Sequence, residues 1–223
     1  MLYPLNLEQM ENYWIAHVPA LLGCFAFAPE REAAVAAAPQ AIAEHRAWLR
    51  AHGEDVADEP VETQVDEVAR EWWPDPDNSV NAFFASDRTP LTGPEVADAL
   101  LWLDWNRADL LDSIVGLGPA DLAREVETGW SINRILLHTG RAEWWYLDRL
   151  DLAFPKEDRP EEPLACLDKV RSYFKTIVPT LVNDDRVTEI DFEIWSPRKM
   201  LRRALWHERD HMLHIKQFRQ KLG

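Results

Sequence analysis

The C-terminal part of the sequence carries three histidines, His207, His211 and His214, at successive spacings of four and three residues. An α-helix turns by about 100° per residue, so these side chains lie within about 60° of one another on one stripe. The stripe continues upstream through Ala204 and Met200, and we expect it to face a hydrophobic core. Because neutral imidazole is the commonest metal ligand among protein side chains, this spacing indicates a metal site.

A second helix is needed to complete such a site, since residues on one face of one helix cannot surround an ion. The candidate is His138, which shares a helical stripe with Ser131 and Ile135. His138 together with His207 and His211 supplies three nitrogen ligands and leaves a coordination position open, as in catalytic rather than structural metal sites. A lone core histidine is more often a hydrogen-bonded structural residue, and it is the combined spacing that favours a metal. The sequence assigns no catalytic residue beyond these ligands.

Other residues near these histidines are open to more than one interpretation. His214 is a fourth ligand, a residue that supports a ligand, a base that lines the pocket, or a packing residue. Asp210 and Glu208 point away from the stripe by angle, so they are poor candidates for the oxygen acceptor of a ligand imidazole, unless they serve a ligand on another helix. Arg203 ends a basic run over residues 198–203 that forms either a solvated face or a rim that holds anions. The remaining pocket candidates are Trp145, Arg149 and Ser131.

The N-terminal part of the sequence alternates in a strand-like way before it becomes helical. Pro39 falls inside the helical stretch and should kink or interrupt the helix, and Gly53 should end it. The histidines of this part have no partner pattern and are expected at the surface or in strands: His17, His45 and His52. We expect strands over residues 2–7, 13–18 and 24–27, a helix over 31–52, and further strands over 61–69 and 79–85.

A family resemblance is carried by the strand over residues 13–19, the step Leu22-Gly23-Cys24 and the Glu- and Ala-rich helix from Glu30. In their β-β-β-α-β order these segments resemble the HicB-like small α+β domain. Members of that family that act as antitoxins carry an added DNA-binding segment, and no ribbon-helix-helix or helix-turn-helix pattern occurs here. The resemblance therefore implies an accessory domain that packs or dimerises.

Helical periodicity dominates the sequence after residue 93. We expect helices over residues 95–115, 131–150, 163–182 and 197–222, with an extended or irregular stretch over 187–195. The expected core positions of the first of these helices are Val96, Leu100, Leu103, Ala108 and Leu111. Four helices with moderate connections indicate a four-helix bundle. The expected fold class is thus α+β with two domains, residues 1–92 with an acidic, Pro-rich linker and residues 93–223.

Two segments of the helical part carry a more specific resemblance. One runs from Trp130 to His138 and on to Trp144-Trp145-Tyr146, and the other runs from His207 to Ile215 with its His-x-x-x-His pair. Their order and spacing resemble the DinB-like (DinB/YfiT) superfamily over residues 93–223, although His214 stands where that family most often has Gln. The resemblance implies a four-helix bundle, often dimeric, that binds a divalent metal such as zinc or nickel. It also implies the family's chemistry, which includes S-transferases that use low-molecular-weight thiols, hydrolases and isomerases.

The charge balance and the cysteines limit the partners and the location of the chain. Its 39 Asp and Glu against 24 Lys and Arg give a net charge of −15, which repels a phosphate backbone, so no nucleic-acid partner is expected. Cys24 and Cys166 lack metal-type spacing and are expected to be reduced, in a cytoplasmic protein. No apolar run approaches ~18 residues, so no membrane span is expected. Ser-His-Asp, Gly-rich phosphate-loop and Cys-x-x-Cys patterns are absent, which disfavours the corresponding chemistries.

Two functions from different classes fit these patterns. The first is a metal-dependent enzyme acting on a small-molecule substrate, in which a metal held by His138, His207 and His211 polarises water or binds a thiol as thiolate. The second is a non-catalytic metal-binding or interaction protein, whose N-terminal domain mediates partner contact or homodimerisation. An open metal position that reaches solvent favours the enzyme, whereas ligands capped on every side by protein groups argue against it.

Overall fold

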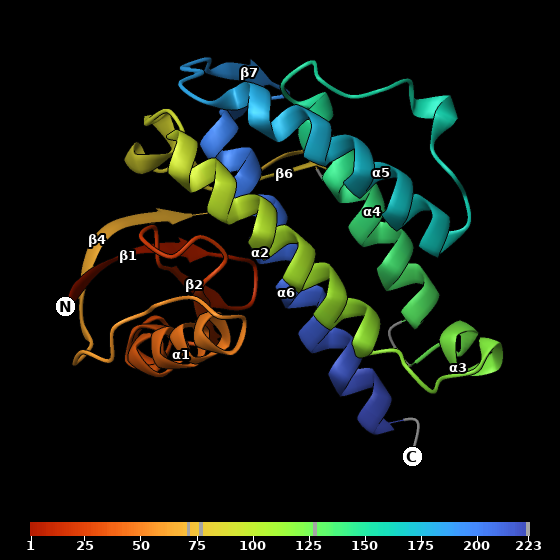
Figure 1. Cartoon of the computed structure of the whole chain (residues 1–223), viewed down its shortest axis with the longest axis horizontal. Coiled ribbons are helices and arrows are strands. Elements are labelled where there is room, and N and C mark those ends of the chain that lie inside the picture. Colours follow the sequence, from red (N-terminus) through yellow and green to blue (C-terminus); the bar gives the residue numbers. More distant parts are fainter. Residues whose placement is uncertain (71, 76–77, 127–128, 222–223) are drawn as a thin grey trace. The chain divides into compact units, whose positions relative to one another are not determined.

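The chain, described by a computed structural model over residues 1–70, 72–75, 78–126 and 129–221, divides into two compact units. The first comprises Met1–Thr89 and Glu189–Trp195, and the second comprises Pro90–Thr188 and Ser196–Gly223. A sheet and one long helix make up most of the first unit, and helices make up most of the second (Figure 1). The expected mixture of an N-terminal sheet and a helical region is therefore confirmed. The domain boundary after residue 92 stays a prediction, and Glu189–Trp195 lies with the first unit.

A four-stranded sheet and one helix form the centre of the first unit. Its elements are, in chain order, β1 (Leu2–Gln9), β2 (Trp14–His17), β3 (Phe25–Ala28), α1 (Arg31–Ala51) and β4 (Glu62–Arg70). The strand order is β3-β2-β1-β4, with β1 antiparallel to β2 and parallel to β4. Parallel neighbours need a crossover, and α1 packs on the sheet along this connection. Its core contains Leu5 and Leu7 of β1, which face the same side as the period of two requires.

The helix α1 continues through Pro39 without interruption, contrary to expectation. Ala34, Ala38 and Ile42 recur on one stripe of the helix and are completely buried. The burial of this stripe offsets the cost of an interior proline, about 3 kcal/mol. Gly53 follows the end of the helix with φ +94°, a conformation that glycine adopts without strain, as predicted for a helix stop.

Two short pairs of strands complete the β structure. β5 (Trp72–Asp75) pairs antiparallel with β6 (Asn78–Val80), and β7 (Thr188–Ile190) pairs with β8 (Glu193–Trp195) within the stretch expected to be extended. The strand predicted over residues 79–85 is wrong beyond Val80. Asp87 accepts a hydrogen bond from the Phe84 N–H at 2.9 Å, and this turns the chain into the 3₁₀ segment η1 (Ala85–Arg88).

The histidines of the first unit are more buried than the sequence indicated. His17 lies in β2, and its Nε2 is 3.0 Å from Oε2 of the buried Glu8. The other carboxylate oxygen of Glu8 accepts a hydrogen bond from the Ala82 N–H at 2.8 Å. His45 was expected at the surface or in a strand, but it lies in α1 and is 3% exposed, because it follows Ile42 by three residues on the buried stripe of that helix.

The second unit consists mainly of four long helices, as predicted. They are α2 (Gly93–Asp112), α4 (Ile132–Asp148), α5 (Pro163–Ile177) and α6 (Pro197–Lys221), and shorter helical segments are α3 (Pro119–Ala123), η2 (Lys156–Asp158) and η3 (Val178–Leu181). Thr92 and Ser131 cap the N-termini of α2 and α4 by accepting hydrogen bonds from the N–H groups three residues on. None of the described helices is long and apolar enough to cross a membrane.

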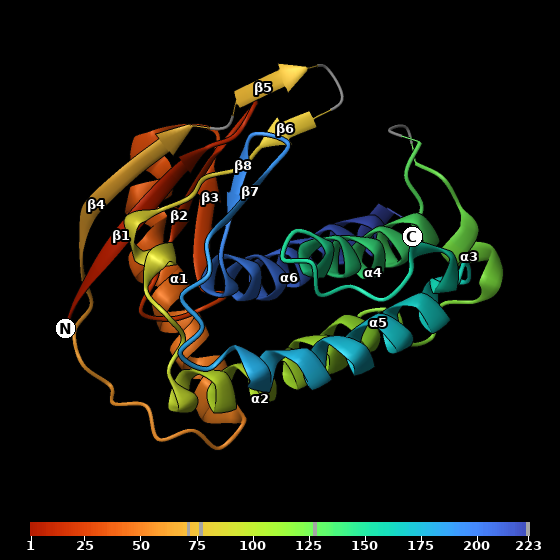
Figure 2. The same ribbon diagram turned by 90° about the horizontal axis from the view of Figure 1, so that it is seen from above.

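The long helices close into a four-helix bundle (Figure 2). α4 packs against both α5 and α6, and α2 packs against α6. Hydrogen bonds from Lys175 to Asp104 and from Arg171 to the Leu103 carbonyl join α5 to α2. The arrangement places one face of α4 against α6, which is what a site shared by these two helices requires.

The buried face of α2 differs in part from the predicted one. Val96 and Leu103 are buried as expected, whereas Ala108 and Leu111 are exposed. Arg107 is buried in place of Ala108. The prediction followed apolar residues alone and so passed over an arginine on the inner face, whose partners are described below.

Candidate metal centre

Three histidines from two helices of the second unit converge on one point. His138 lies on α4, and His207 and His211 lie one turn apart on α6. Nε2 of His207 is 3.2 Å from Nε2 of His138 and 2.9 Å from Nε2 of His211. The ring centroids of His138 and His211 are 4.9 Å apart, with the planes at 90°. The residues predicted as a trio are thus brought together, each with one ring nitrogen turned inward.

The three imidazoles differ in their exposure. His207 and His211 are each 8% exposed, whereas His138 is exposed to solvent. Burial, and then the neighbouring His211 and His138, hold the pKa of His207 well below its ordinary value. Burial, and then His138, do the same for the pKa of His211. Partial enclosure of the His138 ring, together with the charge of Arg134, also lowers its pKa, so all three rings are neutral near pH 7.

Aromatic side chains surround the histidines. The Trp130 ring stacks against His211, with centroids 6.5 Å apart and planes at 25°, and meets His138 edge-on at 5.4 Å. Tyr146 contacts His207 edge-on at 6.0 Å, and the Trp206 ring lies 5.9 Å from it. These rings fix the imidazole orientations and keep water from the buried side of the cluster, which leaves the edge at His138 toward solvent.

The geometry of the donors fits a divalent cation. Two ligands bound ~2.1 Å from one ion lie ~3.0–3.4 Å apart; the nitrogen separation of 3.2 Å falls within this range, and that of 2.9 Å falls just below it. A neutral imidazole carries a single proton, so each ring can offer an unprotonated Nε2 to a shared partner. Three imidazole nitrogens suit zinc, nickel or iron, and a site with three protein ligands keeps a position open.

A second group of side chains lies on the other side of His211. His214 Nδ1 is 3.3 Å from His211 Nδ1 and 3.7 Å from Asp210 Oδ2. Asp210 therefore does not point away from the histidines as expected, because residues four apart on a helix are neighbours. Burial raises the pKa of Asp210, although His214 and Arg203 act in the opposite direction.

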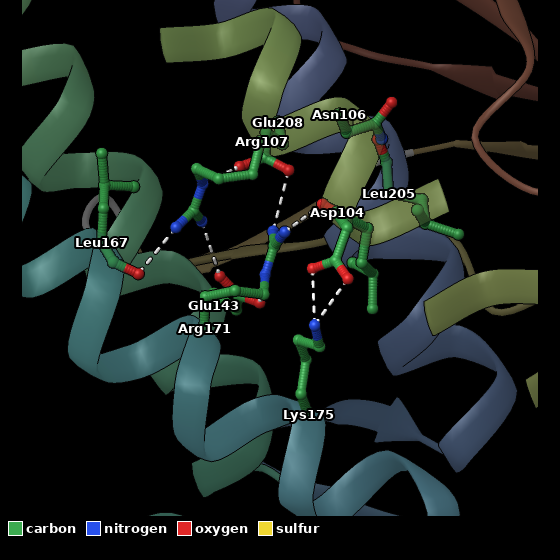
Figure 3. Close-up of polar contacts among 10 residues, drawn as sticks. Asp104, Asn106, Arg107, Glu143, Leu167, Arg171, Lys175, Leu205 and Glu208 are labelled. Carbon is green, nitrogen blue, oxygen red and sulfur yellow. Dashed lines mark hydrogen bonds and ion pairs between the residues drawn. The ribbon is translucent and has the colours of Figure 1, made fainter. Parts of the chain in front are cut away.

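A ring of four buried charges ties the long helices together (Figure 3). Each helix contributes one residue: Arg107 from α2, Glu143 from α4, Arg171 from α5 and Glu208 from α6. Arg107 donates to Glu208 at 2.6 Å and to Glu143 at 3.2 Å. Arg171 donates to Glu143 at 2.6 Å and to Glu208 at 2.8 Å. Each carboxylate thus accepts from both guanidinium groups, and the four charges cancel.

The charged ring also anchors backbone next to the candidate site. The remaining guanidinium nitrogen of Arg107 donates a hydrogen bond to the Leu167 carbonyl, and that of Arg171 donates one to the Leu103 carbonyl. Burial alone would raise the pKa of Glu208, but Arg171 and Arg107 outweigh it and hold this pKa below its ordinary value. Because Glu208 directly follows His207 on α6, and Glu143 comes five residues after His138 on α4, the ring fixes the two helices that carry the histidines.

The predicted pocket residues other than His214 make contacts of their own. Ser131 caps α4 through a hydrogen bond from the Arg134 N–H at 3.2 Å. The Arg149 guanidinium lies over the Trp145 ring at 5.1 Å and pairs with Asp148 at 2.7 Å. The Arg203 guanidinium lies 4.3 Å from the Trp206 ring centroid and 5.9 Å from that of Tyr146. Of these side chains, Arg203 therefore contacts the aromatic residues that enclose His207.

The basic run at the start of α6 is not a solvated face. Lys199, Arg202 and Arg203 are 0%, 4% and 6% exposed. Arg198 pairs with Glu95 at 2.7 Å and donates to the Pro90 carbonyl at 2.9 Å. The hydrogen bond from Arg198 lowers the pKa of Glu95 to about 2. The prediction of a solvated face was wrong because it took charge as a sign of exposure, whereas long basic side chains can be buried when they are paired.

Several residues of the site were not recognised from the sequence. Tyr146 and Trp206 were not proposed as neighbours of His207, and the charged ring was not foreseen. A signal was available for the ring, since Arg107 and Arg171 each lie on the apolar stripe of their own helix, between Leu103 and Leu110 and between Leu167 and Phe174. A charged residue within such a stripe needs a buried partner of opposite charge.

Comparisons with known proteins concern the helical part of the chain. A family model described as the DinB superfamily matches residues 102–215. Among solved structures, YfiT from Bacillus subtilis, described as a probable metal-dependent hydrolase with an unusual four-helix bundle topology, is 18% identical; the match has a TM-score of 0.48 and covers 60% of this chain and 90% of that one. TT2238, described as a four-helix bundle protein, is 24% identical, with a TM-score of 0.45 over 55% of this chain and 98% of that one. No curated protein matches the chain.

The family match contains all three converging histidines, His138, His207 and His211. It does not reach the sheet of the first unit, so the HicB-like resemblance of that part stays a prediction. The match spans 114 of the 223 residues, counted from residue 102 to residue 215, which is more than half of the sequence. The chain belongs to the DinB superfamily.

Proposed function

We propose that this chain is a divalent-metal-dependent enzyme whose metal is bound by His138, His207 and His211. The observation that carries the proposal is the convergence of the three inward-facing nitrogens, with separations of 3.2 and 2.9 Å at His207. Membership of the DinB superfamily supports it, because the family resemblance implies a divalent metal at these positions. We propose zinc or nickel as the ion, since both accept three imidazoles.

The ion and the side chains around it have different roles in the proposed chemistry. An ion with three imidazole ligands and an open position acts as a Lewis acid and lowers the pKa of a water or thiol that reaches it. The buried His207 and His211 stay neutral and keep their lone pairs available. Trp130 and Tyr146 exclude water from the inner side of the cluster. His138 is exposed, which supports the approach of a small-molecule substrate from this side.

Two reaction classes use such a site, and we propose that the chain catalyses one of them. In hydrolysis the nucleophile is water, and in thiol-dependent S-transfer it is a low-molecular-weight thiol. Arg203 lies beside the aromatic residues around His207, which supports a role in holding the negative charge of such a thiol or substrate.

The proposal is tested with protein purified without added metal and then loaded with zinc or nickel. The variants are His138→Ala, chosen because an exposed side chain can be removed with little effect on folding, and His211→Ala. His52→Ala, at the position directly after α1, is the matched control, because it removes an imidazole from outside the cluster. Metal affinity is measured by competition with a coloured chelator. Hydrolysis of 4-nitrophenyl acetate and the reaction of glutathione with 1-chloro-2,4-dinitrobenzene are followed by absorbance.

Wild type and His52→Ala are expected to bind about one ion per chain, and both site variants to bind it more than about 100-fold more weakly, since even partners behind a ligand are worth about 10–100-fold. At least one of the two reactions should depend on the metal and be lost in the site variants. Equal metal affinity in wild type and His211→Ala contradicts the site. Metal binding without a metal-dependent rate in either reaction favours a non-catalytic metal-binding protein instead.

A further inference from the structure

We infer that His214 is a positioning residue for the metal ligand His211. It accepts a hydrogen bond from Nδ1–H of His211 and so fixes the tautomer whose Nε2 lone pair faces His207 and His138. This inference deepens the proposed function and rests on it, because it assigns a task to a residue next to the same site.

The two nitrogens of the His211 ring have different neighbours. Nε2 is 2.9 Å from Nε2 of His207, inside the cluster. Nδ1 is 3.3 Å from Nδ1 of His214, on the opposite side of the ring. Within the part of the chain that the structure describes, His214 is the hydrogen-bond partner of this second nitrogen. The ring is thus held between the candidate metal position and His214.

The number of protons on each imidazole ring determines which of the two Nδ1 atoms, that of His211 or that of His214, donates this hydrogen bond. A neutral imidazole carries one proton, on either Nδ1 or Nε2. If Nε2 of His211 binds a metal, its proton must be on Nδ1, and that N–H needs an acceptor. The Nδ1 lone pair of His214 is such an acceptor, which places the proton of His214 on its own Nε2. The His214 side chain is 46% exposed, so that outer N–H can be hydrated.

The helix makes this pairing a local property of the sequence. His214 follows His211 by three residues and Asp210 by four, so all three side chains lie on adjoining positions of α6. The Asp210 carboxylate, with Oδ2 3.7 Å from His214 Nδ1, adds negative charge beside the pair. Such a charge favours the positive charge of a metal centre and raises the basicity of its ligand.

The same three residues could instead hold a second ion, because their ligand atoms lie within 4.8 Å of one another. His211 would then bind ions through both nitrogens and would have to lose its last proton. A single ion in the three-histidine site requires no such loss, so the observations favour the hydrogen bond. The number of ions bound per chain separates the two arrangements.

The test compares His214→Leu, which removes the acceptor, with His214→Gln, whose amide oxygen restores one. Gln217→Leu is the matched control, because it adds an equal apolar side chain at an exposed position of the same helix. Zinc affinity and stoichiometry are measured by chelator competition, and thermal unfolding of the metal-free proteins checks that each variant folds.

We expect His214→Leu to bind zinc about 10–100-fold more weakly than wild type, with His214→Gln and Gln217→Leu within about threefold of it. Unchanged affinity in His214→Leu overturns the inference, and so does an equal loss in His214→Gln, which would indicate packing. A fall from two ions per chain to one in His214→Leu also overturns it, in favour of a second ion. A wild-type protein that binds neither zinc nor nickel refutes the proposed function, and the inference falls with it.

A measurement on the wild-type protein does not depend on how the variants fold. Long-range ¹H–¹⁵N spectra of the zinc-loaded protein identify the protonated nitrogen of each imidazole. His211 should be protonated on Nδ1 and His214 on Nε2. A proton on Nδ1 of His214 would make it a donor and overturn the inference.

Discussion

The residues around the candidate site owe their charge states to burial and to their partners. His207 and His211 are neutral because burial disfavours the imidazolium form, whereas Glu208 is ionised because two arginines outweigh its burial. Glu95 is ionised for a third reason, a direct hydrogen bond and ion pair with Arg198 that joins the start of α2 to the start of α6. The same pair also makes the stability of the fold depend on pH.

The first prediction concerns this pair. The pKa of Glu95 is about 2 in the folded protein against 4.5 for the unperturbed group, so its stabilising effect is complete above about pH 4.5 and is lost as the pH falls through about 2. Urea unfolding of wild type and Glu95→Gln should show a stability difference near neutral pH that shrinks toward about pH 2. A difference that is constant over this range would show that the pair does not stay ionised in the folded state.

The four long helices are held in register by polar contacts as well as by apolar packing. The charged ring of Arg107, Glu143, Arg171 and Glu208 takes one residue from each helix, and all four are buried. Removing one member leaves an unpaired charge in the interior, which costs far more than the loss of a surface ion pair. The loss of any one residue of the ring should therefore disturb the placement of α4 and α6 and of the histidines that these helices carry.

The second prediction follows from the ring. Arg171→Met should lower the free energy of unfolding by about 3–5 kcal/mol, because Glu143 and Glu208 lose a partner while buried. Lys175→Met is the matched control on the same helix, since Lys175 pairs with Asp104 at a partly exposed position. That control should change stability by about 1 kcal/mol or less. Equal effects of the two substitutions in urea unfolding would contradict the role given to the ring.

The third prediction concerns the close approach of α4 and α5. A Cβ atom on Gly140 would lie 3.1 Å from Sγ of Cys166 and 3.2 Å from the backbone nitrogen of Leu167. Gly140→Ala should therefore force the two helices apart. We expect it to be less stable than Gly93→Ala by about 1–2 kcal/mol, after allowance for the helix propensity that both variants gain.

Gly93 also lies in a helix, but a Cβ atom there would meet no atom within 4 Å, which makes Gly93→Ala the matched control for this comparison. Chemical denaturation of the two variants measures the difference. A Gly140→Ala variant as stable as Gly93→Ala would show that the backbones of α4 and α5 are not tightly packed at this point.

Much of the element arrangement could be predicted from the sequence, because periodicity, capping residues and glycine stops are local signals. Such signals predict the four long helices. Two of these helices, predicted over residues 131–150 and 197–222, carry the three histidines. The charged ring could not be foreseen, since its partners are far apart in sequence and only the closed bundle brings them together. Likewise Pro39 was expected to kink or interrupt α1, and the burial of Ala38 and Ile42, a tertiary effect, outweighs that local preference.

At the scale of the whole molecule, the acidic excess limits what the protein can bind. The net charge is −15, and Lys199, Arg202 and Arg203 of the one basic run are buried. A surface with such an excess of negative charge repels polyanions and attracts cations. This property agrees with a small-molecule or metal ligand and disfavours nucleic acid.

The fourth prediction tests this property. Fluorescence anisotropy of a labelled DNA duplex should show no binding at about 150 mM salt, because the net charge of −15 repels the phosphate backbone. The metal-free and the zinc-loaded protein should behave alike. Binding that weakens steeply as salt is raised would reveal a basic surface and contradict the prediction.

We propose that His138, His207 and His211 together bind one divalent ion. The most direct test of this proposal is a crystal structure of the zinc-loaded protein with diffraction data collected on both sides of the zinc absorption edge. We expect one strong anomalous peak per chain, ~2.0–2.1 Å from Nε2 of each of the three histidines. No peak at this position, or a peak bound by other residues while these three nitrogens stay unligated, would contradict it.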